Sequence, residues 1–113
     1  MTAAVMERDK IVELAEMEEI KALRAKYRED NEELFANGGI KSVIWDLLAI
    51  CDQNIYVGKE AAIYFDILDM RDFLQEKYAE LSATLLPEQK EKIEEALTEA
   101  NESLTTLREL CFQ

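Results

Sequence analysis

Apolar residues near the C-terminus recur at alternating steps of four and three residues, so they fall on one side of a helix. The positions between them are almost all polar, which is typical of a helix that packs against other helices. The seam comprises Ile93, Leu97, Ala100, Leu104, Leu107 and Cys111. This pattern predicts a packed helix over residues 87–111.

A second apolar stripe predicts a helix over residues 59–85. Its members are Ile63, Ile67, Met70, Leu74, Tyr78 and Leu81. Pro87 follows shortly and fits the first position of the next helix, because its missing N–H costs nothing there and its φ already suits a helix. The connection is therefore short enough for the two helices to fold back as a hairpin, in which the C-terminal seam is covered within the chain.

Two more helices are predicted over residues 3–36 and 40–53. Asn37, Gly38 and Gly39 separate them, because Asn and Gly accept the left-handed conformation that ends helices. The apolar arc of 40–53 is wide, which predicts that this helix is the most buried one.

The composition agrees with helix throughout, because only three Gly and one Pro occur in 113 residues and strong helix formers abound. We therefore expect an all-α protein with a single domain over residues 1–113. The expected architecture is an elongated antiparallel bundle of about four helices, at roughly 3–36, 40–53, 59–85 and 87–111.

The first predicted helix carries charged residues among its apolar ones. A helix of this length would extend about 48 Å, whereas a compact chain of this size is roughly 35 Å across. The helix must therefore break, belong to an elongated molecule, or project and pair with another chain. Because mixed seams specify partner and register, we hypothesise a homodimer. The candidate self-association residues are Val12, Glu13, Glu16, Ile20, Leu23, Arg24 and Tyr27.

The net charge of −12 argues against direct binding to nucleic acids or anionic membranes, since both require a cationic surface. Residues 40–57 are the most apolar stretch, but polar and charged residues interrupt them, so we expect no membrane span. Cys51 and Cys111 lie on apolar stripes without CxxC spacing, which favours buried thiols in a reducing compartment. Together with charged residues at positions 7–10, where a signal peptide would be apolar, this predicts a cytoplasmic protein.

The chain contains no histidine, which removes the commonest general base and many metal sites. Two ExxE pairs are present, Glu13 with Glu16 and Glu29 with Glu32. They resemble the acidic pairs that hold Mg²⁺ in all-α nucleotide pyrophosphohydrolases. That family also needs an ExxD pair on the next helix, but Val43 stands three positions before Asp46. We therefore expect no enzyme activity, no cofactor and no metal, and keep this enzyme class as a remote alternative.

The only local basic cluster is Lys21, Arg24, Lys26 and Arg28. In so acidic a chain we expect these side chains to pair with carboxylates of a neighbouring helix or of another subunit, rather than with phosphate groups.

Two classes of function remain. The first is a non-catalytic binding module that docks its acidic helices on a basic partner protein and modulates or inhibits it. Phe65 and Leu68 project away from the main stripe of their helix, so they are either sandwiched between helices, the favoured alternative, or shown to a partner. The candidate partner-binding residues are Tyr64, Phe65, Leu68 and Asp72. The second class is a homo-oligomeric structural protein, such as a scaffold, adaptor or assembly chaperone.

Overall fold

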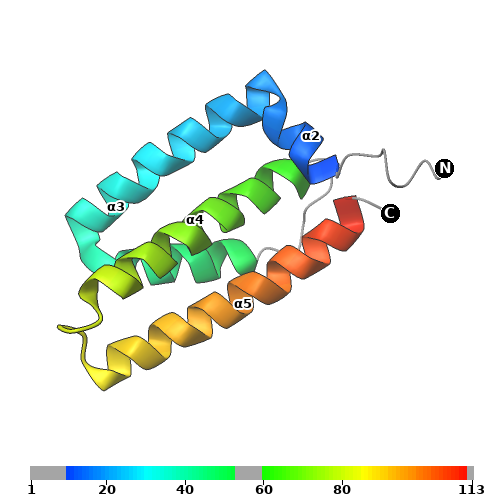
Figure 1. Ribbon diagram of the computed structural model, residues 1–113. Coiled ribbons are helices and arrows are strands. Elements are labelled where there is room, and N and C mark those ends of the chain that lie inside the picture. Colours follow the sequence, from blue (N-terminus) through cyan, green and yellow to red (C-terminus); the bar gives the residue numbers. More distant parts are fainter. Residues whose placement is uncertain (1–9, 53–59, 112–113) are drawn as a thin grey trace.

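The computed structural model describes residues 10–52 and 60–111, with side chains described as far as residue 109. Its helices are α2 (Lys10–Glu16), α3 (Glu18–Cys51), α4 (Glu60–Leu81) and α5 (Pro87–Cys111). The helices pack against one another, and the described ranges contain no strand (Figure 1). The predicted all-α bundle is confirmed, although the beginning of the predicted 3–36 helix and the side chain of Cys111 lie outside the described residues.

The first predicted helix is not continuous, because the chain bends between α2 and α3 (Figure 1). Met17 has an extended backbone with φ −66° and ψ 137°, and its side chain does not cap the helix that follows. The molecule is also elongated, with extents of 52 × 27 × 25 Å. Two of the three expected outcomes for this long segment therefore occur together: the helix breaks, and the molecule is elongated.

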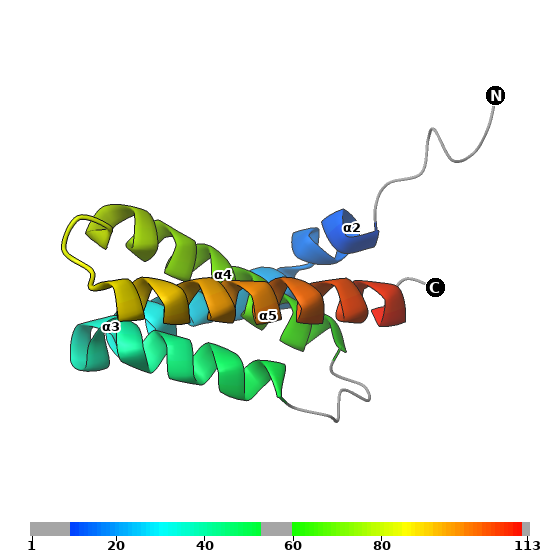
Figure 2. The ribbon, with the colours of Figure 1, turned by 90° about the horizontal axis from the view of Figure 1, so that it is seen from below.

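A sharp turn at Gly39 divides α3 into a first arm, residues 18–38, and a second arm, residues 40–51. Gly39 has φ 72° and ψ −166°, a conformation that residues with a side chain rarely adopt. At Gly38 a β-carbon would collide with the side chain of Ser42. The predicted helix boundary at these residues is confirmed, and the second arm runs back beside α4 and α5 (Figure 2).

The core lies where α4 and α5 meet the second arm. Its fully buried side chains include Val43 and Leu47 of the second arm, Phe65, Ile67 and Leu74 of α4, and Ile93 and Leu107 of α5. The prediction that 40–53 is the most buried helix is wrong, because Trp45 of this segment is 77% exposed whereas α4 has neighbours on both sides. The C-terminal seam is covered within the chain as predicted.

The corner between α4 and α5 is fixed by local hydrogen bonds. The Thr84 hydroxyl donates to the Leu81 carbonyl at 3.0 Å, and the Leu86 N–H donates to Gln89 Oε1 at 2.9 Å. The second bond satisfies a backbone donor next to the start of α5, where no carbonyl of the helix can reach it. Pro87 occupies the first position of α5, as predicted.

By length and hydropathy, α3 is the one helix among residues 10–52 and 60–111 that could cross a membrane. The turn at Gly39 divides it, and its apolar part, the second arm, is shorter than the roughly 20 residues that a span requires. Within the most apolar 18-residue window of α3, 22% of the residues are buried inside the molecule, among them Val43 and Leu47.

Candidate functional site

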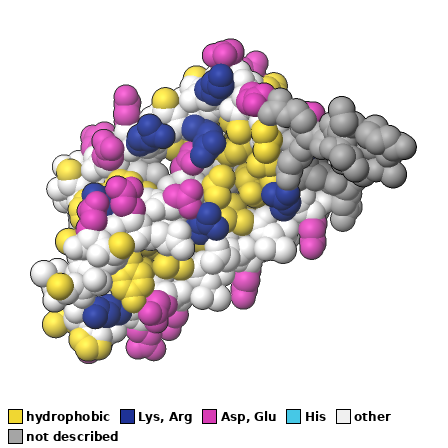
Figure 3. All heavy atoms as spheres, in the orientation of Figure 1, with side chains coloured by type: hydrophobic (Ala, Val, Ile, Leu, Met, Phe, Trp, Pro, Cys, Tyr) yellow, Lys and Arg dark blue, Asp and Glu magenta, His cyan; other side chains and the backbone are white. Residues whose placement is uncertain are grey.

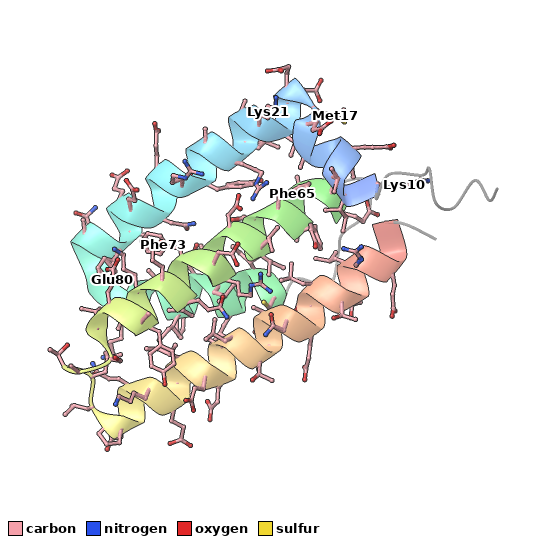
Figure 4. All side chains as sticks on the ribbon, in the orientation of Figure 1. Lys10, Met17, Lys21, Phe65, Phe73 and Glu80 are labelled. Carbon is pink, nitrogen blue, oxygen red and sulfur yellow. The ribbon has the colours of Figure 1, made fainter. Side chains whose placement is uncertain are left out.

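The residues predicted to bind a partner are mostly enclosed. Phe65 is 1% exposed and Tyr64 is also buried, while Leu68 is half-buried and Asp72 is exposed. Phe65 lies on the side of α4 that faces the first arm (Figure 4), where the Arg24 guanidinium stands 5.1 Å from the centre of its ring. Tyr64 and Leu68 line a hollow with residues of α5. Helix α4 is therefore sandwiched, so Phe65 and Tyr64 are not accessible to a partner in this fold.

The residues predicted for self-association divide into two groups. Ile20, Leu23, Arg24 and Tyr27 are buried or half-buried, and the core of the same chain includes Ile20 with Leu23 and Tyr27 packed against it. The Tyr27 hydroxyl donates to the Ala62 carbonyl of α4 at 3.3 Å. The other group, Val12, Glu13 and Glu16, is exposed. The seam of the first arm is thus covered by α4 within the chain, while Val12, Glu13 and Glu16 are exposed, and the homodimer stays a prediction.

Arg24 joins the first arm to α4 through a bidentate ion pair with Asp69. The guanidinium Nη2 lies 2.6 Å from Asp69 Oδ1, and Nε lies 3.0 Å from Oδ2. The hydrogen bond to Asp69 raises the pKa of Arg24, and the nearby charge of Asp72 acts in the same direction. The expectation that basic residues of this segment pair with a neighbouring helix is confirmed for Arg24.

A groove of about 520 Å³ runs between the first arm and α4 beside this ion pair. Its lining mixes both signs of charge, as the neighbouring blue and magenta side chains of Figure 3 show. Lys77 lies 5.0 Å from the centre of the Phe35 ring and 5.3 Å from that of Phe73. The residues that line the groove are Arg24, Arg28, Asn31, Glu32, Phe35, Asp69, Asp72, Phe73, Glu76 and Lys77. Since these charges largely balance within the groove, it has no marked preference for a cation or an anion.

A smaller cavity of about 200 Å³, here called the acidic cavity, is strongly one-sided in charge. It is lined by Tyr27, Asp30, Asn31, Leu34, Asp46, Asp66 and Met70. Asp30 comes from the first arm, Asp46 from the second arm and Asp66 from α4, so the turn at Gly39 is what brings the three carboxylates to one place. Among residues 10–52 and 60–109, no basic side chain lines this cavity.

Within the acidic cavity, the carboxyl group of Asp66 is costly to ionise. Burial, and after it the charges of Asp46, Asp69 and Asp30, raises the pKa of Asp66 to about 6. Burial also raises the pKa of Tyr27, with a further contribution from Asp66. The nearby charge of Asp69 is held by Arg24, so Asp30 and Asp46 are the repelling groups without an ion pair.

The raised pKa of Asp66 predicts a pH-dependent gain in stability for Asp66→Asn. The folded state holds the Asp66 proton more tightly than the unfolded state, so this contribution is complete below pH 4 and is lost as the pH rises through about 6. At pH 8 the variant should be more stable by about 1–2 kcal/mol, once solvent screening of the partly exposed group is allowed for. At pH 4 the two proteins should unfold alike.

Urea unfolding at both pH values measures this difference. Glu29→Gln, which removes an exposed carboxylate of the first arm, is the control and should change little at either pH. An equal effect of the two substitutions at pH 8 would assign the gain to net charge and not to the acidic cavity.

The outer side of α5 carries a row of exposed glutamates. Its members are Glu91, Glu94, Glu95, Glu99 and Glu102. They lie on the side opposite the buried seam, with Glu91, Glu95, Glu99 and Glu102 at steps of four and three, and together with Thr98 the five line a shallow depression. We call these five residues the α5 glutamate face. The Tyr78 hydroxyl donates to Glu94 at 2.9 Å, but the salt bridges of the described residues include none of the five.

No arrangement for catalysis emerges from these groups. Among residues 10–52 and 60–111, no three His, Cys, Asp or Glu side chains are placed to hold a metal ion. Burial raises the pKa of the Cys51 thiol, which opposes a role as a nucleophile. Comparison of the chain with protein-family models, with curated proteins and with solved structures gives no match, so the candidate sites are defined by their geometry and charge.

Proposed function

We propose that this protein is a non-catalytic binding module that docks on a basic partner protein and modulates or inhibits it. The observation that carries the proposal is the α5 glutamate face, with five carboxylates on the exposed side of a helix whose inner side is buried. From Glu91 to Glu102 the face extends about 16 Å along the helix. A rigid, regularly spaced row of negative charges complements a cationic groove or helix of similar length.

The core of the bundle supports this assignment, because it keeps α5 straight and fixed. Ile93, Ala96, Ala100, Leu104 and Leu107 anchor the inner side of the helix. The backbone positions that carry the outer carboxylates are therefore fixed before binding, which lowers the backbone entropy lost in a complex. Binding should be fast at low salt and weaken as salt rises. A partner that uses its cationic surface for another ligand would then be inhibited by occupation of that surface.

The proposal predicts that neutralising the α5 glutamate face weakens capture of the partner about tenfold or more. The test uses the triple variant Glu91→Gln, Glu95→Gln and Glu99→Gln as bait in a lysate of the source cells, at low and high salt. The matched control is Glu29→Gln, Glu32→Gln and Glu33→Gln, which removes the same charge from exposed positions of the first arm. Equal loss with both baits would show that net charge alone matters, and this would contradict the proposal.

The second candidate is a homo-oligomeric structural or assembly protein. The observation that favours it is the exposure of large apolar side chains at Val12 and Met17 near the bend between α2 and α3, and at Trp45 on the second arm. Light scattering at micromolar concentration separates the two candidates, because a monomeric mass contradicts self-assembly and leaves the binding module.

A further inference from the structure

The acidic cavity has features that its role in the fold does not require. Its three carboxylates converge from the two arms of α3 and from α4, and its lining includes no basic side chain of the described part of the chain. Asp46 and Asp66 are half-buried and Asp30 is exposed, so two of the carboxylates are brought together where burial limits their hydration, and clustered carboxylates repel one another. The unbalanced charge therefore calls for a cation from outside the cavity.

Asn31 provides a second and independent observation. It is 2% exposed and lines the acidic cavity as well as the groove beside it. The side-chain hydrogen bonds within the described part of the chain include none to its amide. Every fully enclosed side-chain nitrogen or oxygen there has a partner, so the Asn31 amide keeps its remaining access through these hollows. The amide has no hydrogen-bond partner among the described residues and reaches these hollows, so it is available to bond to a ligand that enters one of them.

The remaining side chains that line the acidic cavity indicate which kind of cation it would bind. Leu34 and Met70 supply apolar surface, and Tyr27 supplies an aromatic ring that attracts a cation lying over its face. The volume of about 200 Å³ is below the roughly 300–1,000 Å³ of sites that enclose a drug-sized ligand, so it suits one charged head group with part of its alkyl stem.

A bare metal ion fits this site poorly. Metal ions need several ligands at about 2.0–2.6 Å from one point, and the described carboxylates are not arranged in this way. A guanidinium or primary ammonium group has several N–H donors directed outward, so it bonds to acceptors that stand further apart.

We propose that the acidic cavity binds a guanidinium or primary alkylammonium group through Asp30, Asp46, Asp66 and the Asn31 amide, with Tyr27 against its face. The group belongs either to an arginine or lysine side chain of a partner protein or to a free small molecule of the same chemistry. This site is separate from the α5 glutamate face, and the inference does not depend on the function proposed for that face.

Binding at this site should strengthen as the pH rises through about 6. Asp66 is protonated below this pH because of burial and of the neighbouring charges of Asp46, Asp69 and Asp30, and a neutral carboxyl attracts a cation less. Arg24 faces the same region but is paired with Asp69, and the Tyr27 phenol remains neutral because its pKa is raised.

The test is a titration of the intact protein with N-acetyl-arginine amide, followed by the backbone amide signals of residues around the cavity. N-acetyl-citrulline amide, which has the same shape without the charge, is the control ligand. We expect saturable shifts with the arginine compound at pH 7.5, weaker binding at pH 5 and no saturation with the citrulline compound. Asp66→Asn and Asp46→Asn should each weaken binding at least tenfold, whereas Glu91→Gln on α5 should leave it unchanged.

The same variants distinguish the two sources of the cation. If Asp66→Asn also weakens capture of the partner, the head group is a side chain of that partner. If capture is unchanged while binding of the arginine compound is lost, the ligand is a free small molecule. Equal binding of both compounds, or equal binding by the wild type and by both cavity variants with their fold intact, would overturn the inference.

Discussion

Replacing Phe65 with alanine is expected to lower the free energy of unfolding by about 3–5 kcal/mol. The ring is 1% exposed, stands edge-on to Tyr64 at 5.4 Å between centres, and has the Arg24 guanidinium over its face. Alanine would leave a cavity in the middle of α4, where the first arm covers the helix. A loss of this size is a large share of the stability of a small domain.

The midpoint of urea unfolding, with an unchanged slope, measures this loss. Trp45→Ala is the matched control, because this large aromatic side chain is 77% exposed. The control should change the stability by less than about 0.5 kcal/mol. If Phe65→Ala were as mild as the control, the ring would not be part of the core, and its interpretation as a partner contact would return.

Replacing Arg24 with methionine is expected to cost about 1–3 kcal/mol, because Asp69 would keep its charge in a partly buried position without its partner. The guanidinium makes three contacts with the Asp69 carboxylate, at 2.6, 3.0 and 3.2 Å. Methionine keeps much of the apolar stem of the arginine but removes the guanidinium from over the Phe65 ring, so the single variant reports on the ion pair and on this cation–π contact together.

A double-mutant cycle with Asp69→Asn isolates the interaction. The double variant should be clearly more stable than the sum of the two single losses predicts, since it leaves no unpaired charge. Lys21→Met is the control, because Lys21 belongs to the same basic cluster but contacts only Glu18 at 3.7 Å on the surface. Additive losses for Arg24 and Asp69 would contradict a bidentate pair between α3 and α4.

The parts of the fold that local chemistry determines could be predicted from the sequence. Gly39 ends the first arm because its positive φ suits glycine, and Pro87 starts α5 because proline suits the first helical turn. The break at Met17 could not be predicted. Methionine favours helix, and no side chain caps the start of α3, so nothing in the local sequence marks this break.

The two candidate sites also differ in how far the sequence could predict them. The α5 glutamate face follows from spacing along one helix, because its five glutamates recur on the side opposite the apolar seam. The acidic cavity depends on Asp30, Asp46 and Asp66, which are distant in the chain and meet only after the turn at Gly39 and the return of α4. Periodicity could place each of them on a helix, but it could not show that they share a cavity. The sequence does not decide whether Phe65 packs inside the chain or contacts a partner. A second apolar side of a helix fits either a neighbouring helix or a partner.

The central claim is that the α5 glutamate face binds the partner. Carbodiimide labelling of carboxylates in the complex with the captured partner tests this claim most directly. Labelling of Glu91, Glu95 and Glu99, read by mass spectrometry, should fall several-fold on binding, whereas labelling of Glu29 and Glu33 on the first arm should not change. Unchanged labelling of the α5 glutamates in a complex that protects other carboxylates would contradict the account.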